Sequence, residues 1–519
     1  MNVLFMPSNI QISVEPDTTV LAAIYKTGLW VDAPCGGHGN CGKCRVLVTK
    51  GNSKEYSIEE MRCLSQEEKN KGVRLACKMI IKEDTCVILS DLENQVNQSM
   101  EDIRVLDKDR KKCEYGLALD IGTTTVEYMV LNILDGAVVC KDRFYNPQRK
   151  YGADVIARIG ACLDDQSKVQ EMSHELISTL EERLKDKLYL LDLSPKCIRK
   201  AVVVANTAMC HFFTGHSPDK LARAPFQPDY WGGNIQFTEE LGLSLADKAT
   251  VEILPIVGGH IGADTVGCMA ALEFDKMTGF QLLVDIGTNG EIVLKGSDCL
   301  LACSTAAGPA FEGACMTYGM CASPGAINKV LYGDNGISFH VEGNVRPVGL
   351  SGTGIIDAVA TMLKAGIMDS TGYLKEEYCV VDPVTEQEGY CLFQDNLGGV
   401  YITRQDIRQL QLAKAAISAG IKTLLKVAEV KIEDLSGIFI AGAFGTQLNL
   451  ENAMQLKLLP TIDITRYHQI GNGALSGAMK RIRNQVTMEE LKSLASQVQH
   501  IELAEDKGFN QTFLDNIQF

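Results

Sequence analysis

An internal repeat constrains the fold of this chain more than any other feature of its sequence. Residues 116–131 (GLALDIGTTTVEYMVL) are matched by residues 281–294 (QLLVDIGTNGEIVL), a displacement of 165 positions from Asp120 to Asp285. In each copy an apolar stretch ends in Asp-Ile-Gly-Thr and a second apolar stretch follows directly, which predicts a β-hairpin closed by a glycine-rich turn. We expect each copy to begin one α/β lobe, with a cleft between the two lobes.

The sequence around and between the two copies alternates between helical and buried-strand patterns, which is typical of α/β lobes. The helical patterns cover residues 154–162, 173–190 and 413–427, and the strand patterns cover residues 200–205, 251–257 and 437–441.

Length and charge exclude several classes of protein. A chain of 519 residues predicts three or four domains, at about 150 residues each. Its 50 Lys and Arg against 65 Asp and Glu give a formal charge of −15, which disfavours nucleic acid and anionic membranes as partners. Residues 1–20 lack the pattern of a secretory signal, and no run of about 18 apolar residues occurs, so we expect a cytoplasmic protein.

The first ninety residues form a unit of their own. Short β-rich runs (2–5, 10–14, 45–49 and 85–89) surround a segment rich in Cys and Gly, which predicts a small mixed α/β domain. The residues that follow are polar and charged, with little to bury, and are expected to be a linker. The predicted division is a first domain at 1–90, a linker at 91–112, a first lobe at 113–280 and a second lobe at 281–519.

Cysteines in the first domain indicate a metal cluster. Eighteen cysteines in a large chain without a secretory signal are more typical of reduced thiols plus a metal or cluster site than of disulfides. Three of them follow the spacing C-x5-C-x2-C on a glycine-rich loop, and a fourth follows after 32 further residues. Four thiolates so arranged can surround a two-iron cluster. These four are Cys35, Cys41, Cys44 and Cys77.

Two alternatives accompany the cluster assignment. A zinc site usually shows two C-x2-C pairs, which this segment lacks. Cys63 and Cys86 are rivals for the fourth position, although the Leu-Ala-Cys context favours Cys77. Over roughly residues 1–90 the chain resembles the two-iron ferredoxin family. That resemblance implies a β-grasp fold and a [2Fe-2S] cluster.

The repeated hairpins suit a nucleotide polyphosphate. A carboxylate can hold hydrated Mg²⁺, and backbone amides and hydroxyls can bind phosphate oxygens, so two such turns would clamp the phosphates from both sides. Asp120 and Asp285 are the expected Mg²⁺ ligands. A buried strand that ends in small residues (438–445, IFIAGAFG) is suited to a purine resting on Gly442 and Gly445. The phosphate-binding residues predicted are Asp120, Gly122, Thr123, Thr124, Thr125, Asp285, Gly287, Thr288, Asn289 and Gly290.

Together these elements resemble the actin, sugar-kinase and heat-shock ATPase superfamily over roughly residues 113–485, which implies two RNase H-like lobes and ATP as ligand. Residues 258–271 (GGHIGADTVGCMAA) are similar to the superfamily stretch that carries a catalytic carboxylate. Asp264 is therefore the candidate for positioning or deprotonating the attacking group, and a helix N-cap is its structural alternative. Residues 304–313 and 350–354 are candidate cleft loops, or plain tight turns.

The order of ferredoxin domain, linker, first lobe and second lobe resembles the reductive activators of corrinoid-dependent enzymes over nearly the whole chain. This resemblance implies a multidomain α/β and α+β protein of an anaerobe that hydrolyses ATP. It also implies that one electron passes from the [2Fe-2S] cluster to an inactive cob(II)amide protein of a methyltransferase system, which restores cob(I)amide.

The expected partners are that corrinoid protein, an upstream low-potential electron donor and, as one option, a second copy of the chain in a homodimer. Three alternatives stay open. The chain could donate electrons to a dehydratase or reductase without a corrinoid, phosphorylate a small molecule, or act as a redox sensor that only reports the energy state. Product analysis would distinguish these alternatives: phosphate released to water indicates an ATPase, phosphate on a metabolite indicates a kinase, and no turnover indicates a sensor.

Overall fold

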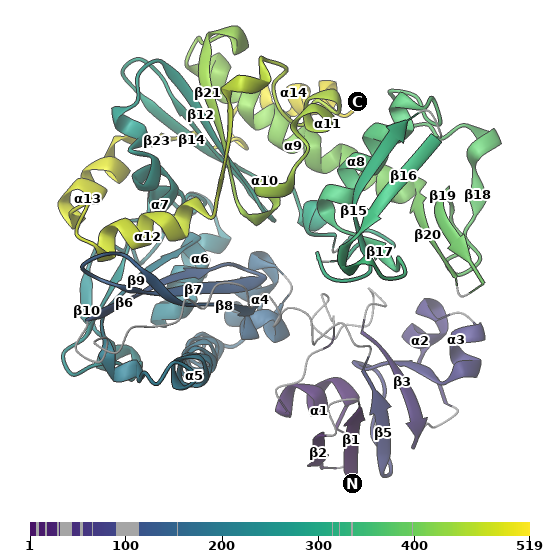
Figure 1. Cartoon of the computed structure of the whole chain (residues 1–519). Helices are drawn as coiled ribbons and strands as arrows, with labels where there is room; N and C mark the ends of the chain where they lie inside the picture. Colours follow the sequence, from purple (N-terminus) through teal and green to yellow (C-terminus); the bar gives the residue numbers. More distant parts are fainter. Residues whose placement is uncertain are drawn as a thin grey trace.

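A computed structural model shows three bodies, an N-terminal domain and two larger lobes (Figure 1). The structure describes all residues except 7–9, 16–17, 28–30, 32–43, 52–54, 65, 90–113, 153, 314, 321, 334–335 and 397. The predicted linker at 91–112 and the predicted cluster ligands Cys35 and Cys41 therefore lie outside the described residues. Within the described part of the chain, no helix combines the length and apolar character needed to cross a membrane.

The N-terminal domain is built on a mixed five-stranded sheet. Its elements are β1 (Asn2–Met6), β2 (Ile10–Ser13), α1 (Val20–Lys26), β3 (Arg45–Lys50), α2 (Ile58–Cys63), α3 (Gln66–Lys71), β4 (Val73–Leu75) and β5 (Thr85–Ile88). The strand order is β2-β1-β5-β3-β4, with β1 and β5 parallel and the other pairs antiparallel. Alternate residues such as Val46 and Val48 point into one core, as expected for strands with one buried face. This is the predicted β-grasp arrangement.

The first lobe contains a six-stranded sheet in the order β10-β11-β9-β6-β7-β8. Its strands are β6 (Tyr115–Ile121), β7 (Thr125–Asn132), β8 (Val138–Tyr145), β9 (Ile198–Ala205), β10 (Ile235–Phe237) and β11 (Thr250–Ile253). Its helices are α4 (Val155–Asp164), α5 (Ser167–Tyr189), α6 (Thr207–Thr214) and α7 (Ala263–Leu272). Strands β6 to β8 form an antiparallel meander, and β9 and β11 join it in parallel. Helix α5 buries Met172, Leu176, Leu180 and Leu184, one turn apart, in the core of this lobe.

The second lobe repeats this plan, with a sheet in the order β22-β21-β12-β13-β14-β23. Its strands are β12 (Phe280–Ile286), β13 (Gly290–Lys295), β14 (Leu300–Thr305), β21 (Leu435–Ala441), β22 (Tyr467–Gly471) and β23 (Val498–His500). Its helices are α9 (Arg404–Val427), α10 (Ala443–Gln447), α11 (Leu450–Gln455), α12 (Gly473–Ile482), α13 (Met488–Gln497) and α14 (Phe509–Asp515). Five strands repeat the pairing of the first lobe, an antiparallel meander from β12 to β14 joined in parallel by β21 and β22, which confirms two RNase H-like lobes. The sixth strand differs, since β23 pairs in parallel with β14 at the opposite edge from β10.

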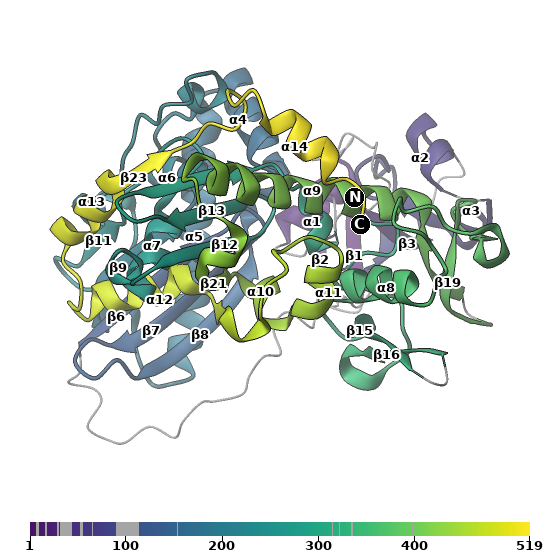
Figure 2. The same ribbon diagram turned by 90° about the horizontal axis from the view of Figure 1, so that it is seen from above.

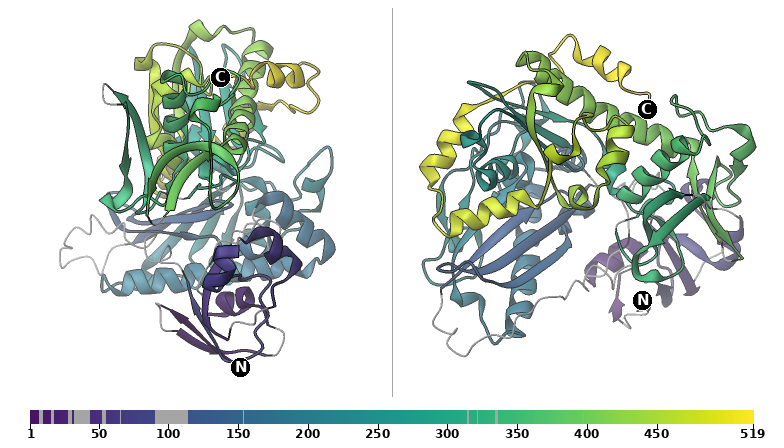
Figure 3. Two further views of the ribbon diagram at one scale, coloured as in Figure 1. Left: turned by 90° about the vertical axis from the view of Figure 1, so that its right-hand side faces the viewer. Right: turned by 45° about the horizontal axis from the view of Figure 1, so that its top comes forward.

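An insertion between β14 and α9 enlarges the second lobe. It holds two three-stranded sheets, and the sequence analysis predicts none of its elements. They are β15 (Ala326–Gly333), β16 (Gly336–Val341), β17 (Gly349–Leu350), α8 (Gly352–Lys364), β18 (Val380–Val381), β19 (Glu388–Asp395) and β20 (Gly398–Thr403). The views of Figures 1, 2 and 3 agree that the N-terminal domain lies beside this insertion.

Crossing helices join the two lobes. Helix α12, late in the chain, packs against α7 and against β6 and β9 of the first lobe. At the crossing a Cβ on Gly477 would lie 2.1 Å from the carbonyl oxygen of Gly267, so the two backbones touch. Arg481 of α12 forms an ion pair of 2.7 Å with the buried Glu252 of β11. Residues that the sequence division assigns to the second lobe (281–519) thus complete the core of the first.

Candidate functional site

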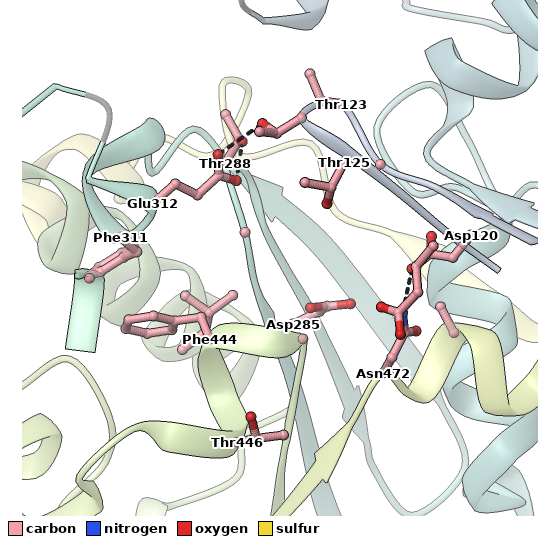
Figure 4. A pocket seen from close by; sticks show the side chains of 18 of the residues that line it. Asp120, Thr123, Thr125, Asp285, Thr288, Phe311, Glu312, Phe444, Thr446 and Asn472 are labelled. Atoms are coloured by element: carbon pink, nitrogen blue, oxygen red, sulfur yellow. Dashed lines mark hydrogen bonds between the residues drawn. The ribbon is translucent and has the colours of Figure 1, made fainter. Parts of the chain in front are cut away.

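A cavity of about 590 Å³ lies between the lobes, and both repeated hairpins open into it (Figure 4). The fold thus brings residues from the two copies of the repeat to one site. The predicted residues that line the cavity are Asp120, Gly122, Thr123, Thr124, Thr125, Asp264, Asp285, Gly287, Thr288, Asn289 and Gly442.

Two predicted glycines serve packing beside the cavity and do not line it. A Cβ on Gly290 would lie 2.8 Å from Oγ1 of Thr305, and one on Gly445 would lie 2.7 Å from Cγ2 of Ile440. Neither position has room for a side chain, so these glycines allow the strands and α10 to pack closely. Gly442 is different, because it lines the cavity and a Cβ there would lie 2.8 Å from Oδ1 of Asp285.

The turns of the two hairpins begin alike, but the first is one residue longer, with residues 122–125 inside its last cross-strand pair against 287–289 in the second. The backbone N–H of Gly122 donates to the carbonyl oxygen of Thr125 at 2.9 Å, and that of Gly287 donates to Asn289 at 3.0 Å. A Cβ on Gly122 would lie 2.6 Å from the same Thr125 oxygen, which explains the need for glycine in the first turn. Both turns therefore present their hydroxyl and amide side chains to the cavity.

Asp120 and Asp285 carry raised pKa values. Burial raises the pKa of Asp120 to about 7, and neighbouring carboxylates add to this effect while a hydrogen bond from Asn472 opposes it. Burial also raises the pKa of Asp285 to about 7, supported by the charge of Asp264 and opposed by the Cys268 thiol. Carboxylates crowded in this way favour a proton or a divalent cation, which fits the predicted Mg²⁺ ligands.

Asp264 lies in the first turn of α7, where Gly262 is the N-cap. The N-cap alternative is therefore wrong for Asp264, although its side chain does accept a hydrogen bond of 2.7 Å from the backbone N–H of Thr265. Burial is the main cause that raises the pKa of Asp264 to about 6. A carboxylate that titrates near neutral pH beside the phosphate hairpins is suited to proton transfer.

The sequence analysis missed most of the remaining polar lining. Glu127 and Glu291 pair across the strands with Asp120 and Asp285, so the repeat itself carries the signal that would identify them. Counted over the described lining residues, six carboxylates face one cationic side chain. The carboxylates are Asp120, Glu127, Asp264, Asp285, Glu291 and Glu312, and the cation is Arg143. A nucleotide polyphosphate would be repelled here without a divalent cation.

Aromatic and loop residues complete the cavity on the side of α10. Phe311 and Phe444 both line it, and their rings lie 5.3 Å apart (Figure 4). Ser351, Gly352 and Thr353 also line it, so both candidate cleft loops (304–313 and 350–354) reach the cavity. An apolar wall next to Gly442 is suited to a purine base.

Cys44 and Cys77 lie side by side in the N-terminal domain. Both are buried, and a hydrogen bond from the Cys77 side chain is the main cause that lowers the pKa of Cys44 to about 7. Arg45 pairs with Leu75 in the sheet, so Cys44, just before Arg45, and Cys77, just after Leu75, lie at the same end of strands β3 and β4. Cys86 pairs with Lys50 at the other end of β3 and is therefore a poor rival for the fourth ligand. Two adjacent thiols, of which Cys44 has a lowered pKa, fit a cluster site.

Comparisons with known proteins agree with this architecture. Residues 4–82 match the model of the 2Fe-2S iron-sulfur cluster binding domain, residues 115–277 match the RACo middle region, and residues 279–519 match the C-terminal ASKHA domain of RACo. The chain belongs to the RACo family. Its first domain is of the cluster-binding type, and its C-terminal domain is of the ASKHA type, which supports ATP binding.

Relatives cover the whole length of the chain. The corrinoid activation enzyme RamQ of Eubacterium limosum is 29% identical and aligns over 100% of this chain and 99% of its own. A Methanosarcina barkeri protein named "[Co(II) methylated amine-specific corrinoid protein] reductase" is 24% identical over 78% of this chain and 77% of its own. The solved structure of a reductive activator for a corrinoid, iron-sulfur protein has 26% identity, 100% and 98% coverage and a TM-score of 0.72.

Proposed function

We propose that this protein is an ATP-dependent reductive activator that transfers one electron to the cob(II)amide of a corrinoid protein and restores the cob(I)amide needed for methyl transfer. The observation that carries the proposal is the pairing, in one chain, of cluster-type thiols with two phosphate hairpins that face one cavity. The names of the relatives point to the corrinoid acceptor.

The nucleotide is proposed to bind with its phosphates between the hairpins and its base toward Phe311 and Phe444. The side chains of Thr123, Thr124 and Thr288 are suited to donate to phosphate oxygens. Mg²⁺ would be held by Asp120 and Asp285, where it would neutralise both the phosphates and the crowded carboxylates. Without the cation, the acidic lining would oppose binding.

Asp264 is proposed to accept the proton of the attacking water. Its pKa of about 6 leaves it ionised at neutral pH and still basic enough to take a proton. Asp264 lies in the first turn of α7, and α7 packs across α12 between the lobes. Hydrolysis at this residue can therefore be coupled to movement of the lobes.

The energy needed is modest. A [2Fe-2S] cluster held by Cys35, Cys41, Cys44 and Cys77 would supply the electron at about −400 mV, the usual potential of plant-type clusters. For one electron, an acceptor potential about 100 mV lower costs roughly 2.3 kcal/mol. Closure of the lobes on ATP could meet this cost by favouring a complex in which the cobalt has lost an axial ligand.

The decisive experiment is an anaerobic titration of a cob(II)amide-loaded corrinoid protein in the presence of reductant, with and without Mg-ATP. We expect the cob(I)amide band to grow only with ATP. The band should be lost in Cys77→Ala and in Asp285→Asn. Matched controls are Cys86→Ala in the same domain and Asp395→Asn, whose carboxylate pairs with Arg346 on the surface of the second lobe.

Equal rates of cobalt reduction with and without ATP would contradict the proposed coupling. Phosphate found on a metabolite would instead indicate a kinase. ATP hydrolysis with no cobalt reduction by several corrinoid proteins would indicate a different electron acceptor.

A further inference from the structure

Glu312 makes a contact that a nucleotide site would not be expected to contain. It ends a short 3-10 helix (Pro309–Glu312) that follows β14, and its carboxylate bridges the two phosphate hairpins. The hydroxyl of Thr124 donates to Oε2 at 2.9 Å, and the hydroxyl of Thr288 donates to Oε1 at 2.7 Å. Figure 4 shows the Glu312 carboxylate pointing toward the side chain of Thr288.

The two hydroxyls come from different lobes, and they belong to the group proposed to bind the nucleotide phosphates. A carboxylate that accepts from both presents two anionic oxygens, as a terminal phosphate would. Two anions cannot share the same two donors without strong repulsion. A phosphate that reaches these hydroxyls must therefore move Glu312 away, or bind without them.

We propose that Glu312 takes the place of the terminal phosphate when ATP is absent, and that its displacement distinguishes ATP from ADP and is passed to the ferredoxin domain. This inference rests on the proposed binding of ATP in the cavity. It makes Glu312 a specificity-determining residue for the terminal phosphate.

Thr317 and Tyr318, a few residues after Glu312, are held to the second lobe by hydrogen bonds. Thr317 donates to Oδ1 of Asp406 through its backbone N–H at 2.7 Å and through its hydroxyl at 3.1 Å. The hydroxyl of Tyr318 donates to Oδ2 of Asp382 at 2.8 Å. The N–H of Leu350, which precedes the cavity loop, donates to the carbonyl oxygen of Tyr318 at 2.8 Å. Gly313, next to Glu312, lies against Gly319, next to Tyr318, because a Cβ on Gly319 would lie 2.0 Å from the Gly313 carbonyl oxygen. A shift of Glu312 is therefore expected to move Tyr318 through this backbone contact and to strain its hydrogen bonds.

Tyr318 in turn faces the ferredoxin domain. Gly319, next to Tyr318, forms a β-bridge with Leu350 of β17, the strand on the side of the insertion that lies toward the ferredoxin domain in Figure 1. Burial and the hydrogen bond to Asp382 raise the pKa of the Tyr318 hydroxyl, while the positive charge of Arg45 acts on this hydroxyl and lowers its pKa. Arg45 begins β3 directly after Cys44, one of the proposed cluster ligands. The ferredoxin domain lies beside the insertion of the second lobe in Figures 1 and 3. A path of few residues thus leads from the phosphate hairpins to the cluster end of the ferredoxin domain.

The first test measures nucleotide affinity by calorimetry in the absence of any corrinoid protein. Glu312→Gln and Glu312→Ala are expected to bind a non-hydrolysable ATP analogue at least about tenfold more tightly than the wild type, because the competing charged acceptor is gone. Affinity for ADP should change by less than about twofold, since ADP lacks the competing phosphate. Glu342→Gln is the matched control, because its carboxylate bonds Asn328 within the second lobe.

Unchanged or weaker binding of the ATP analogue in both Glu312 variants would overturn the proposal, as would an equal gain for ADP. These results differ from failure of the proposed function, in which the wild type would bind neither nucleotide. Normal circular dichroism and an intact cluster spectrum are required of each variant.

The second test follows the path to the ferredoxin domain by chemical labelling. The ATP analogue should raise the rate at which a dicarbonyl reagent modifies Arg45 by at least about twofold, and ADP should not. Glu312→Gln should show the raised rate without nucleotide. Arg62, exposed in the same domain, is the internal control and should not respond. Equal Arg45 rates in all states of the wild type would overturn the proposed transmission.

Discussion

The two phosphate hairpins share a motif but are held in different ways. Asp120 of the first lobe accepts a hydrogen bond of 2.7 Å from the Asn472 amide, at the start of α12. Asp285 of the second lobe accepts a weak hydrogen bond of 3.8 Å from the Cys268 thiol, on α7. Each aspartate is therefore braced by one of the two crossing helices, and the first brace is much the stronger.

This difference shows what the repeat determines and what it does not. Duplication accounts for two Asp-Ile-Gly-Thr hairpins, each with an aspartate and a glutamate paired across the strands, although the first turn is one residue longer. The braces come from outside the repeat, at the crossing of α7 and α12. Movement of the lobes about this crossing would change the surroundings of both aspartates together, which is a physical basis for coupling hydrolysis to domain motion.

The largest effect is expected when the charge of one hairpin aspartate is removed, and this tests whether the two hairpins are equivalent. Asp120→Asn and Asp285→Asn should each lower the rate of ATP hydrolysis by about a thousandfold, because each removes a proposed Mg²⁺ ligand and a fixed charge at the phosphates. Phosphate release at saturating Mg-ATP measures the effect. Asp395→Asn should keep the wild-type rate. Loss of activity in only one of the two variants would show that the hairpins are not functional equivalents.

The helix crossing can be disturbed without touching either hairpin. Gly477→Ala places a Cβ 2.1 Å from the Gly267 carbonyl oxygen, so the helices must separate, at a cost of about 2 kcal/mol in the free energy of unfolding. ATP hydrolysis should fall as well, because the brace on each aspartate shifts.

Gly160→Ala is the matched control for this substitution. Gly160 lies inside α4, and a Cβ there meets no atom within 4 Å. Alanine is the better helix former, so this variant should gain up to about 1 kcal/mol. Denaturant unfolding measures both variants, and equal stability of the two would contradict the tight crossing.

Much of this architecture is predictable from the sequence because its signals are local. A strand, Asp-Ile-Gly-Thr and a second strand identify each hairpin, and both form as expected, β6–β7 and β12–β13. The C-x2-C pair and Cys77 identify the cluster-binding domain. Helix α5 is predicted to begin at residue 173, and the structure begins it at Ser167, because the polar first turn carries little hydrophobic signal.

The remaining parts depend on contacts between distant residues, which no local pattern encodes. Asn472 meets Asp120 from 352 positions away. Glu312 lies in a candidate cleft loop, yet nothing in its neighbourhood predicts a bridge to Thr124 and Thr288. Helix α12 is assigned by position to the second lobe, and only tertiary packing shows that it completes the core of the first.

Substituting the hydrogen-bond donor of each aspartate in turn compares the hairpins through a smaller effect. The Asn472 oxygen caps α12 by accepting from Leu475 at 2.8 Å, while its amide nitrogen donates to Asp120. Asn472→Asp keeps the cap but sets a second anion against Asp120, and should weaken Mg-ATP binding about tenfold. Cys268→Ala removes a weak thiol donor and one buried sulfur atom without adding charge, and should change affinity less than about twofold. Calorimetric titration with Mg-ATP distinguishes them, and similar losses in both variants would contradict unequal bracing.

The smallest expected effect is a dependence of the free energy of unfolding on pH, to which both hairpin aspartates should contribute. Burial raises the pKa of Asp120 and of Asp285 to about 7 in the nucleotide-free protein, well above the ordinary value of 3.8. Between these values the folded protein binds more protons than the unfolded chain, so the free energy of unfolding falls as the pH rises toward 7. Because both carboxylates face an open cavity, this loss should total only about 1 kcal/mol between pH 5.5 and 7.5.

Mg-ATP should abolish this dependence, since a bound cation keeps its carboxylate ligands ionised and releases their protons. Asp120→Asn and Asp285→Asn should each remove about half of it in the nucleotide-free protein. Thermal melting across the pH range, with and without Mg-ATP, measures the slopes. If one variant alone removed the whole dependence, only that aspartate would titrate in this range. In that case the stronger hydrogen bond on Asp120 and the greater crowding of carboxylates around it would not cancel, and the two aspartates would have different pKa values.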